Sequence, residues 1–416
     1  MRFAPKKENK FRIIGIMTGT SMDGIDVSIS DFEYNSNSNF EKSENITKPK
    51  ITPIAFEEFE FNHNYKSKIK SLINESTHIK YISALNFYLA EVFADSVNQI
   101  LTKYKIKPNE IDAIAVHGQT IWHEPKGNEF IGQHINHTFQ AINGSALAKL
   151  TKIPVIYDFR SGDVALGGQG APLVPIFDFN YFSELDKNIA VLNIGGIANV
   201  TLLNSKVKSK VVAFDTGPGN MLIDFVAHKY FGLDYDKNGE LANEGLIDYL
   251  LLEELSKNEY FEIKPPKSTG RELFGEMFLE SKLSEFKVKH NYEIDKYNLI
   301  RTVTEFTIQS ICTQITKFSN LKTNSKLEKT KLDKIIVSGG GTNNSFLIER
   351  LKEVFESNNS HNGLNILISD ELGVKSQSKE AIAFAYLGYL FLVGEKGNLP
   401  SVTGASKETI LGVIAF

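Results

Sequence analysis

The stretch VVAFDTGPGN, residues 211–220, contains the pattern from which the rest of the chain is best understood. Its apolar first part is typical of a buried strand, and that strand stops at a carboxylate, Asp215. Gly217, Pro218 and Gly219 then predict a sharp turn. Glycines let a backbone approach a ligand closely and direct its N–H groups at an anion. The stretch therefore indicates a general base beside a phosphate-binding turn, although an aspartate that only caps its own turn would give the same pattern.

Length and charge restrict the class of protein. The chain has 416 residues, and one hydrophobic core usually stops growing at roughly 250–300 residues, so we expect two domains with a cleft between them. The composition, 42% hydrophobic and 23% charged, is typical of a soluble globular protein. A net charge of -4 gives no basic surface for nucleic acid and no polybasic segment for a membrane. Small molecules are therefore the expected partners.

Cysteine content and hydropathy predict the compartment. The single cysteine, Cys312, excludes an intrachain disulfide framework. The N-terminal residues MRFAPKKENKFRIIGIM are charged and lack the apolar core of a secretory signal. The most apolar run, AIAFAYLGYLFLVG at 381–394, is shorter than the roughly 20 residues that span a bilayer, so we interpret it as a buried helix. The sequence thus predicts a cytoplasmic protein without a membrane span.

The order of predicted elements repeats in the two halves of the chain. Each half opens with a strand, a tight turn and a second strand, and continues with alternating helices and strands, as in α/β domains. We place the first domain at 1–185, with 395–416 returning to it, and the second at 186–394. Strands are expected at 11–17, 25–32, 51–58, 111–116, 153–157, 189–194, 197–203, 211–215, 334–338 and 365–369, and helices near 65–74, 80–105, 141–150, 172–183, 219–231, 245–256, 294–318, 344–357 and 379–394.

Four polar turns follow apolar strands, and they are TGTSMDG at 18–24, NIGGIAN at 193–199, DTGPGN at 215–220 and SGGGTNN at 338–344. Ligands of open α/β sheets collect at the carboxyl ends of strands, and glycine-rich turns there suit a nucleotide polyphosphate. The chain lacks the G-x-x-x-x-G-K-[ST] motif, and it lacks a G-x-G-x-x-G that opens a helix after the first strand. Paired β-hairpins remain as the phosphate-binding arrangement.

Eight segments carry a more specific resemblance. They are GTSMDGIDV at 19–27, HGQTIWHEP at 117–125, GGQGAPLVP at 167–175, LNIGGIANV at 192–200, FDTGPGNML at 214–222, PKSTGRE at 266–272, GGGTNN at 339–344 and NLPSVTGAS at 398–406. Together they resemble the anhydro-N-acetylmuramic acid kinase family, within the superfamily of sugar kinases, hexokinase, Hsp70 and actin. The resemblance extends over essentially the whole chain. It implies an α/β fold of two actin-like, ribonuclease H-like domains with mixed, mostly parallel sheets that flank an ATP cleft.

The resemblance also implies an activity. Members of this family use ATP and magnesium to convert 1,6-anhydro-N-acetylmuramic acid, a product of peptidoglycan turnover, to N-acetylmuramic acid 6-phosphate, and they are typically homodimers. Asp215 would be the catalytic base. ATP would be bound by Gly19, Thr20, Ser21, Met22, Asp23, Gly24, Ile25, Asp26, Gly195, Gly196, Asn199, Gly217, Gly219 and Asn220, with Gly339, Gly340 and Asn343 near the adenosine. The sugar would be bound by His117, Gln119, Thr120, Arg160 and Glu380.

Two departures from the family pattern bear on the sugar. Ser161 and Gly162 stand where some relatives carry further arginines, and Ile142 replaces an expected glycine. The histidines 117, 123, 134 and 137 have no carboxylate or thiol at metal-ligand spacing, so we expect magnesium to arrive with ATP and no metal to be held by the protein. Two other functions remain open, namely an actin-like or Hsp70-like ATPase that acts on a protein partner, and an amino-sugar kinase without the hydrolytic step.

Overall fold

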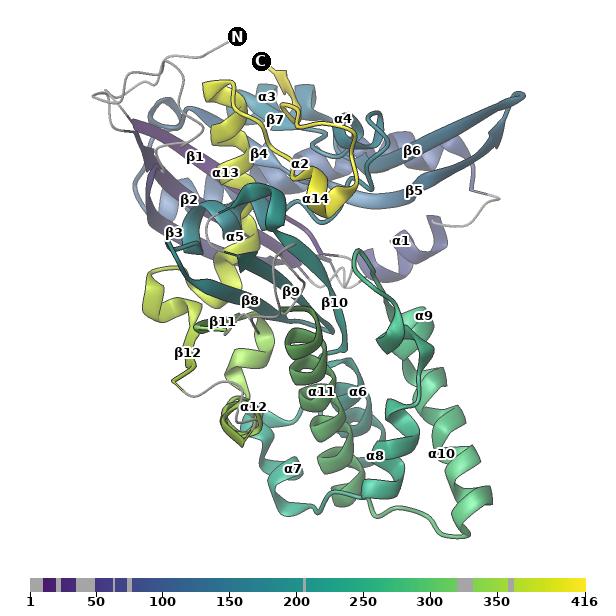
Figure 1. Cartoon of the computed structure of the whole chain (residues 1–416). Helices are drawn as coiled ribbons and strands as arrows, with labels where there is room; N and C mark the ends of the chain where they lie inside the picture. The colour runs from purple at the N-terminus through teal and green to yellow at the C-terminus, as the bar shows by residue number, and fades with distance from the viewer. Residues whose placement is uncertain are drawn as a thin grey trace. The chain divides into compact units, whose positions relative to one another are not determined.

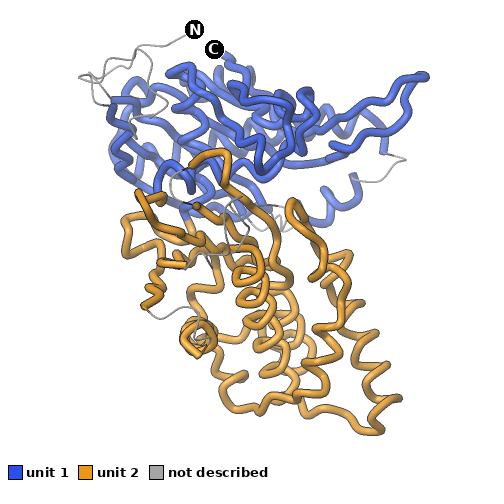
Figure 2. Tube along the Cα trace, viewed as in Figure 1, with its two compact units in different colours: residues 1–181, 378–416 blue, residues 182–377 orange. Residues whose placement is uncertain are grey.

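The computed structural model describes residues 10–19, 24–34, 49–62, 64–72, 77–204, 207–319, 332–357 and 363–416. Four predicted phosphate-binding residues, Thr20, Ser21, Met22 and Asp23, lie outside these ranges. The chain divides into two compact units, of which unit 1 comprises residues 1–181 and 378–416 and unit 2 comprises residues 182–377 (Figure 2). In the described ranges, no helix is long and apolar enough to cross a membrane.

Unit 1 is built on a mixed sheet with the strand order β13-β7-β4-β1-β2-β3. Its first three strands, β1 (Lys10–Met17), β2 (Gly24–Glu33) and β3 (Lys50–Glu60), form an antiparallel meander. β4 (Ala113–Val116) and β7 (Val155–Tyr157) continue the sheet in parallel with β1, and β13 (Val413–Ala415) closes it in the antiparallel sense. The apolar runs that predicted these strands are almost fully buried in β1, β2 and β4.

Helices cover both faces of this sheet. α2 (Ile79–Lys103) and α3 (Gly144–Thr151) share one hydrophobic core with Ile14 and Ile16 of β1. The opposite face carries α13 (Lys379–Val393), which approaches so closely that a Cβ on Gly15 would lie 1.9 Å from the carbonyl oxygen of Ala381. The remaining helices of unit 1 are α1 (Tyr65–Leu72), α4 (Ser161–Val164), α5 (Pro175–Phe182) and α14 (Pro400–Thr403) (Figure 1).

The place of α13 corrects the predicted domain boundary. The sequence placed residues 379–394 with the second domain, whereas the structure packs this helix on β1, β2 and β4 of unit 1. Apolar residues on every side of a helix indicate that the helix is buried, but they do not indicate which sheet it packs against.

A two-stranded ribbon of unit 1 was missed by the sequence analysis. It consists of β5 (Gln119–Phe130) and β6 (Gln133–Ala141), and Figure 1 shows it extending away from the remainder of unit 1. Most of its side chains are exposed or half-buried, including Phe130 and Ile131 at the tip. Because only the base of the ribbon, at Ile121 and Ala141, packs into the core, its sequence lacks the sustained alternation of apolar and polar residues that marks a half-buried strand.

Unit 2 repeats the strand order of unit 1. Its sheet has the order β10-β9-β8-β11-β12, in which β8 (Asn188–Ile194), β9 (Ile197–Asn204) and β10 (Val212–Pro218) form the meander. β11 (Lys334–Ser338) and β12 (Asn365–Ile368) extend the sheet in parallel with β8. In both sheets the second strand of the meander runs against its neighbours, while the first, third and following two strands run one way. The expected fold class, paired α/β domains with mixed and mostly parallel sheets, is confirmed.

The helices of unit 2 pack around α11 (Lys296–Ser319), whose residues contribute heavily to the core of this unit. The helix predicted at 219–231 is present as α6 followed by a π-helical turn at Ala227–Phe231, whereas the helix predicted at 245–256 begins only at Tyr249. The sequence analysis missed α10, which places apolar side chains on all sides and so shows no helical stripe. The other helices are α6 (Met221–Val226), α7 (Glu240–Glu244), α8 (Tyr249–Ser256), α9 (Arg271–Phe274), α10 (Glu276–His290) and α12 (Ser345–Ser357).

Candidate active site

Two glycine-rich turns of unit 2 are joined through their backbones at the ends of β8 and β10. The N–H of Asn220 donates to the carbonyl of Gly195 (2.8 Å), and the N–H groups of Gly219 and Met221 donate to the carbonyl of Gly196 (2.9 and 3.1 Å). A Cβ on Gly219 would lie 2.2 Å from the carbonyl oxygen of Gly195, so no side chain fits there. The structure thus brings four of the predicted phosphate-binding residues into one backbone surface.

The turn after β11 adjoins this surface. Gly339 has a φ of +89°, and a Cβ on it would lie 2.7 Å from the carbonyl oxygen of Ile194. Gly340 is exposed, and the nearest atom to a Cβ there would be Asn220 Nδ2, at 3.9 Å. Asn343 is exposed at the end of the same turn. Glycine is therefore required at 339 by the protein itself, whereas the space beside Gly340 is open.

Asp215 lies on β10 immediately before a bulge. It pairs in register with Asn199 of β9, and the pairing then shifts at Gly217, whose φ is +140°. Its carboxylate Oδ2 accepts a hydrogen bond from the main-chain N–H of Thr269 (2.8 Å). A bulge commonly re-aims a side chain at a sheet edge, and here it separates the carboxylate from the glycine turn by a single residue.

The environment of Asp215 suits a proton acceptor. Burial raises the pKa of its carboxyl to about 6, and the charge of Glu272 adds to the rise. The hydrogen bond from Thr269 and the charge of Lys267 act in the opposite direction. A base whose pKa lies just below neutral pH is ionised under physiological conditions and still takes up a proton readily.

In unit 1, His117 and Arg160 form a buried pair. His117 lies directly after β4, and its Nδ1 is 2.6 Å from the carbonyl oxygen of Gly118. Its Nε2 accepts from Arg160 Nε (3.0 Å) and lies 2.8 Å from Arg160 Nη2. These contacts fix the neutral tautomer with the proton on Nδ1, because Nε2 must accept. Burial and the Arg160 charge hold the pKa of His117 well below its usual range.

The charge of Glu380 acts on Arg160 of this pair and also on Asp26. Burial raises the pKa of Glu380, in the first turn of α13, while the charge of Arg160 opposes that rise. Burial also raises the pKa of Asp26 to about 7, with contributions from the charges of Glu58, its cross-strand neighbour, and Glu380. Arg160 is itself buried, which lowers its pKa to about 10. The structure therefore gathers Asp26, His117, Arg160 and Glu380 into one polar group of unit 1.

Other predicted residues of unit 1 lie around this group in different roles. Gln119 is buried and accepts from the hydroxyl of Tyr65 (3.2 Å), and the Thr120 hydroxyl is buried and takes no hydrogen bond from the described part of the chain. Ile25 is fully buried in the core, so only its backbone could meet a ligand. Gly24 begins β2, where a Cβ would lie 2.9 Å from a backbone oxygen of β3, and Gly19 is half-buried just after β1.

The second aspartate of the DFRSGD segment, Asp163, has an architectural role. It is fully buried, and its Oδ1 accepts from Asn398 Nδ2 (2.7 Å) and Thr403 Oγ1 (2.8 Å). Its Oδ2 accepts from the N–H of Gly170 (2.8 Å). One carboxylate therefore ties the neighbouring segments DFRSGD (158–163) and GGQGAP (167–172) to the distant segment NLPSVTGAS (398–406). No pattern in the sequence predicted this link.

The two departures from the family pattern have structural partners. The Ser161 hydroxyl donates to Asp158 Oδ1 (2.5 Å), so it supports the local turn. Ile142 is buried in the core of unit 1, and its Cγ2 lies 3.0 Å from where a Cβ on Gly118 would be. Ile142 therefore packs beneath the turn that carries His117.

The remaining clustered histidines lie on the β5–β6 ribbon and bind other groups. His123 Nδ1 is 2.9 Å from Thr138 Oγ1, and His134 Nε2 is 2.7 Å from the carbonyl oxygen of Lys126. Within the ranges that the structure describes, no three His, Cys, Asp or Glu side chains are grouped so that they could hold a metal ion.

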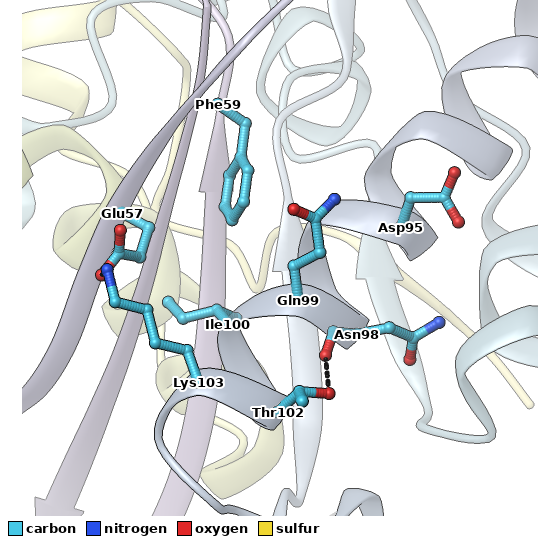
Figure 3. A pocket seen from close by; sticks show the side chains of 8 residues that line it. All are labelled: Glu57, Phe59, Asp95, Asn98, Gln99, Ile100, Thr102 and Lys103. Carbon is cyan, nitrogen blue, oxygen red and sulfur yellow. Dashed lines mark hydrogen bonds and ion pairs between the residues drawn. The ribbon is translucent and has the colours of Figure 1, made fainter.

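Two surface cavities lie outside these groups. One, of about 590 Å³, lies between β3 and the end of α2 and contains none of the predicted site residues; Glu57 and Lys103 form an ion pair at its edge (2.6 Å) (Figure 3). The second, of about 280 Å³, belongs to unit 2 and is lined by residues near α7, α11 and α12. Its lining includes Asn243, Arg301 and Phe346, with the Arg301 guanidinium 4.4 Å from the centre of the Phe346 ring.

Comparisons with known proteins support the family suggested by the motifs. A family model described as anhydro-N-acetylmuramic acid kinase matches residues 11–416. The anhydro-N-acetylmuramic acid kinase of Bacillus thuringiensis subsp. konkukian is 38% identical over 406 residues, which cover 97% of this chain and 99% of that protein. The protein of the same name from Clostridioides difficile is 38% identical over 404 residues, covering 96% of this chain and 97% of that one.

Similarity to solved structures is weaker. A ROK family glucokinase from Streptomyces griseus, in complex with glucose and AMPPNP, is 8% identical and aligns with a TM-score of 0.35, covering 90% of this chain and 97% of that one. A TM-score this low carries no argument about fold or ligand.

The geometry around Asp163 gives a stability prediction. Asp163→Ala should destabilise unit 1 by at least about 3 kcal/mol, because three buried donors lose their acceptor and each such loss costs about 1–3 kcal/mol. Calorimetry should show the unfolding transition of this unit at a lower temperature. Asp95→Ala, at an exposed position of α2, is the matched control and should shift that transition little. Equal melting temperatures for the two variants would contradict the role of Asp163.

Proposed function

Because this chain belongs to the anhydro-N-acetylmuramic acid kinase family, we propose that it opens the internal ring of 1,6-anhydro-N-acetylmuramic acid and phosphorylates the sugar to N-acetylmuramic acid 6-phosphate with ATP. The observation that carries the proposal is the position of Asp215. A carboxylate with a pKa of about 6 lies one residue before a glycine turn that is bonded to the turn carrying the exposed Gly196. Such a site combines a base with an anion cradle, as ring opening and phosphoryl transfer together require.

The reaction follows from the chemistry of the anhydro sugar. Its anomeric carbon is bonded to the 6-oxygen, so attack of water at that carbon breaks this bond and frees the 6-oxygen. The freed oxygen then bonds to the γ-phosphorus of ATP, and ADP leaves. Asp215 takes the proton of the attacking water, and positioned proton transfer of this kind contributes about 10²–10⁴-fold to a rate. Because the ionised form is the base, the rate should rise with pH through about 6 and then level off.

The turns of unit 2 fit the phosphates of ATP. Gly196 and Gly340 are exposed, whereas the N–H groups of Gly195, Gly219 and Asn220 already donate to main-chain carbonyls. We therefore assign the phosphates to the open space beside Gly196 and Gly340. Magnesium, when bound with ATP, neutralises phosphate charge and orients the transferred group. For the adenosine end we propose the 280 Å³ cavity, where the Arg301 guanidinium stacked on Phe346 offers a flat surface for a base.

We assign the sugar to the polar group of unit 1. Arg160 and the neutral His117 are held in fixed orientations by their mutual hydrogen bonds, and Glu380 adds an acceptor for sugar hydroxyl or amide groups. Arg160 is also the candidate for the lactyl carboxylate, because Ser161 and Gly162 supply no further positive charge. The buried Thr120 hydroxyl is a further candidate contact.

The two other functions that the sequence left open are less favoured. Similarity over 97% of the chain is to kinases of the anhydro sugar, which does not favour an ATPase that acts on a protein partner. A kinase without the hydrolytic step would need a sugar with a free 6-hydroxyl. We also propose that the protein is a cytoplasmic homodimer, and light scattering of the purified chain at two concentrations should give twice the chain mass of 46.6 kDa.

The first functional prediction concerns Asp215→Asn. The variant should fold and bind ATP, but it should lose ring opening and phosphorylation together, because the acceptor oxygen exists only once the ring opens. In ¹⁸O-water the wild-type product should carry label at the anomeric hydroxyl and none in the phosphate, by mass spectrometry. Chelation of magnesium should stop the wild-type reaction. Label in the phosphate, or near-normal phosphorylation by the Asn variant, would contradict the mechanism.

The second functional prediction concerns the glycine turns. Gly196→Val and Gly340→Val should weaken ATP binding at least about 10-fold while the fold survives. A Cβ at either position meets no protein atom closer than 3.5 Å, and the added methyls occupy the space assigned to the phosphates. Calorimetric titration with a non-hydrolysable ATP analogue measures the loss. Gly162→Val, at an uncrowded position of unit 1, serves as the control, and normal ATP affinity in both turn variants would show that the turns were misassigned.

A further inference from the structure

The segment PKSTGRE, residues 266–272, is a family motif to which none of the roles above gives a function. Three backbone or side-chain groups between Tyr260 and Thr269 bind a single residue, Asp215. We propose that this segment is a positioning clamp for the catalytic base, with Lys267 as its anchor and the N–H of Thr269 as its contact with the carboxylate. The inference rests on the proposed function, in which Asp215 is that base.

Lys267 is held from several sides. Its Nζ donates to Gln314 Oε1 of α11 (2.7 Å) and to the carbonyl oxygen of Tyr260 (2.9 Å). The same ammonium lies 4.3 Å from the centre of the Tyr260 ring, 5.4 Å from that of Phe318 and 5.9 Å from that of Phe214. Two oxygen acceptors and three aromatic rings therefore fix the position of a half-buried cation, since ring faces attract ammonium groups.

The anchored segment reaches Asp215 at three points. The main-chain N–H of Asp215 donates to the carbonyl of Lys267 (3.2 Å), and the Tyr260 hydroxyl donates to the carbonyl of Asp215 (2.7 Å). The N–H of Thr269 donates to the carboxylate Oδ2 (2.8 Å). The main-chain N–H, the main-chain carbonyl and one carboxylate oxygen of Asp215 are thus each fixed by a hydrogen bond. Oδ1, which takes no hydrogen bond from the described part of the chain, is left as the proton acceptor.

The clamp also sets the charge balance around the base. Of the groups that act on the pKa of Asp215, burial and Glu272 raise it, whereas the hydrogen bond from Thr269 and the charge of Lys267 lower it. Burial lowers the pKa of Lys267 itself to about 8, with the charges of Glu262 and Asp215 acting against that change. Removing the anchor should therefore both loosen the carboxylate and make it bind its proton more tightly.

A role for Lys267 as a direct catalyst is less consistent with these contacts. Its ammonium already donates to two protein oxygens and is enclosed by rings, so a reacting group would have to displace them. A role confined to packing is the other alternative. It would make the protein less stable without changing the pH dependence of the reaction.

The test compares Lys267→Met with Lys264→Met, an exposed lysine just before the segment. We expect Lys267→Met to lower kcat by about 10–100-fold, since small misplacements of a catalytic group cost rate on this scale. The KM for the anhydro sugar should change less than about two-fold, and the acidic limb of the pH–kcat profile should move up by about one pH unit. Lys267→Arg should restore part of kcat, and Lys264→Met should match the wild type.

A second measurement does not depend on activity. In protein labelled with ¹³C-aspartate, the Asp215 carboxyl resonance, identified by its loss in Asp215→Asn, should titrate at higher pH in Lys267→Met than in the wild type. If Lys267→Met does not fold, Tyr260→Phe removes only the hydroxyl that binds Asp215 and should give smaller shifts in the same direction.

The possible outcomes separate the two proposals. A wild-type protein that makes no phosphosugar would overturn the proposed function, while a raised carboxyl pKa in Lys267→Met would still support the clamp. Unchanged carboxyl titration and an unchanged pH–kcat profile in folded Lys267→Met and Tyr260→Phe would overturn the clamp, whatever the activity of the wild type.

Discussion

The close approach of Gly219 to the carbonyl of Gly195 is the constraint on which the unit 2 site depends. A distance of 2.2 Å from that oxygen to a hypothetical Cβ leaves no room for any side chain, and the backbone bonds of Gly219, Asn220 and Met221 to the 195–196 turn follow from this contact. Because the two turns are joined, β10 ends beside the turn between β8 and β9, and Asp215 lies immediately before the bulge that begins the second turn. Open space remains beside Gly196 and Gly340. The junction of the two turns and the position of Asp215 are therefore consequences of one packing condition.

Unit 1 depends on a different kind of interaction, a buried carboxylate that serves as a shared acceptor. Asp163 joins segments that begin at positions 158, 167 and 398, and its buried carboxyl group is tolerated because its oxygens accept three hydrogen bonds. Family motifs of this chain thus divide into two classes. In the proposed function, residues such as Arg160 and Asp215 contact a ligand, whereas Asp163, Lys267 and Gly219 hold the surrounding segments in place. A motif identified from sequence alone does not distinguish the two classes, since both require a fixed residue type.

Much of the fold follows from local patterns, and the parts that do not follow have identifiable causes. Buried strands and glycine turns were predicted within a few residues, because apolar runs and the special backbone angles of glycine are local properties. The β5–β6 ribbon and α10 were missed because their side chains are not sorted by burial. The unit to which α13 belongs could not be deduced, because it depends on the gap above Gly15, which is a tertiary property. The closeness of Gly195, Gly219 and Gly340 was predicted from the order of the strands. The contacts of Tyr260, Lys267 and Thr269 with Asp215 were not predicted, because they join segments about fifty residues apart and produce no periodic pattern in the sequence.

The shared strand order of the two sheets has a consequence for protein engineering. The same five-strand plan carries different crossovers, because α1 and α2 connect β3 to β4 in unit 1, whereas α6 to α11 connect β10 to β11 in unit 2. Likewise the β5–β6 ribbon and α3 fill the interval from β4 to β7, whereas α12 fills the equivalent interval from β11 to β12. Strand ends bear the reactive groups and crossovers differ freely in length, so diversity introduced into a crossover should be tolerated far better than diversity in a strand. A library aimed at new acceptor sugars would best be confined to the segment between β4 and β7, with the scaffold left untouched.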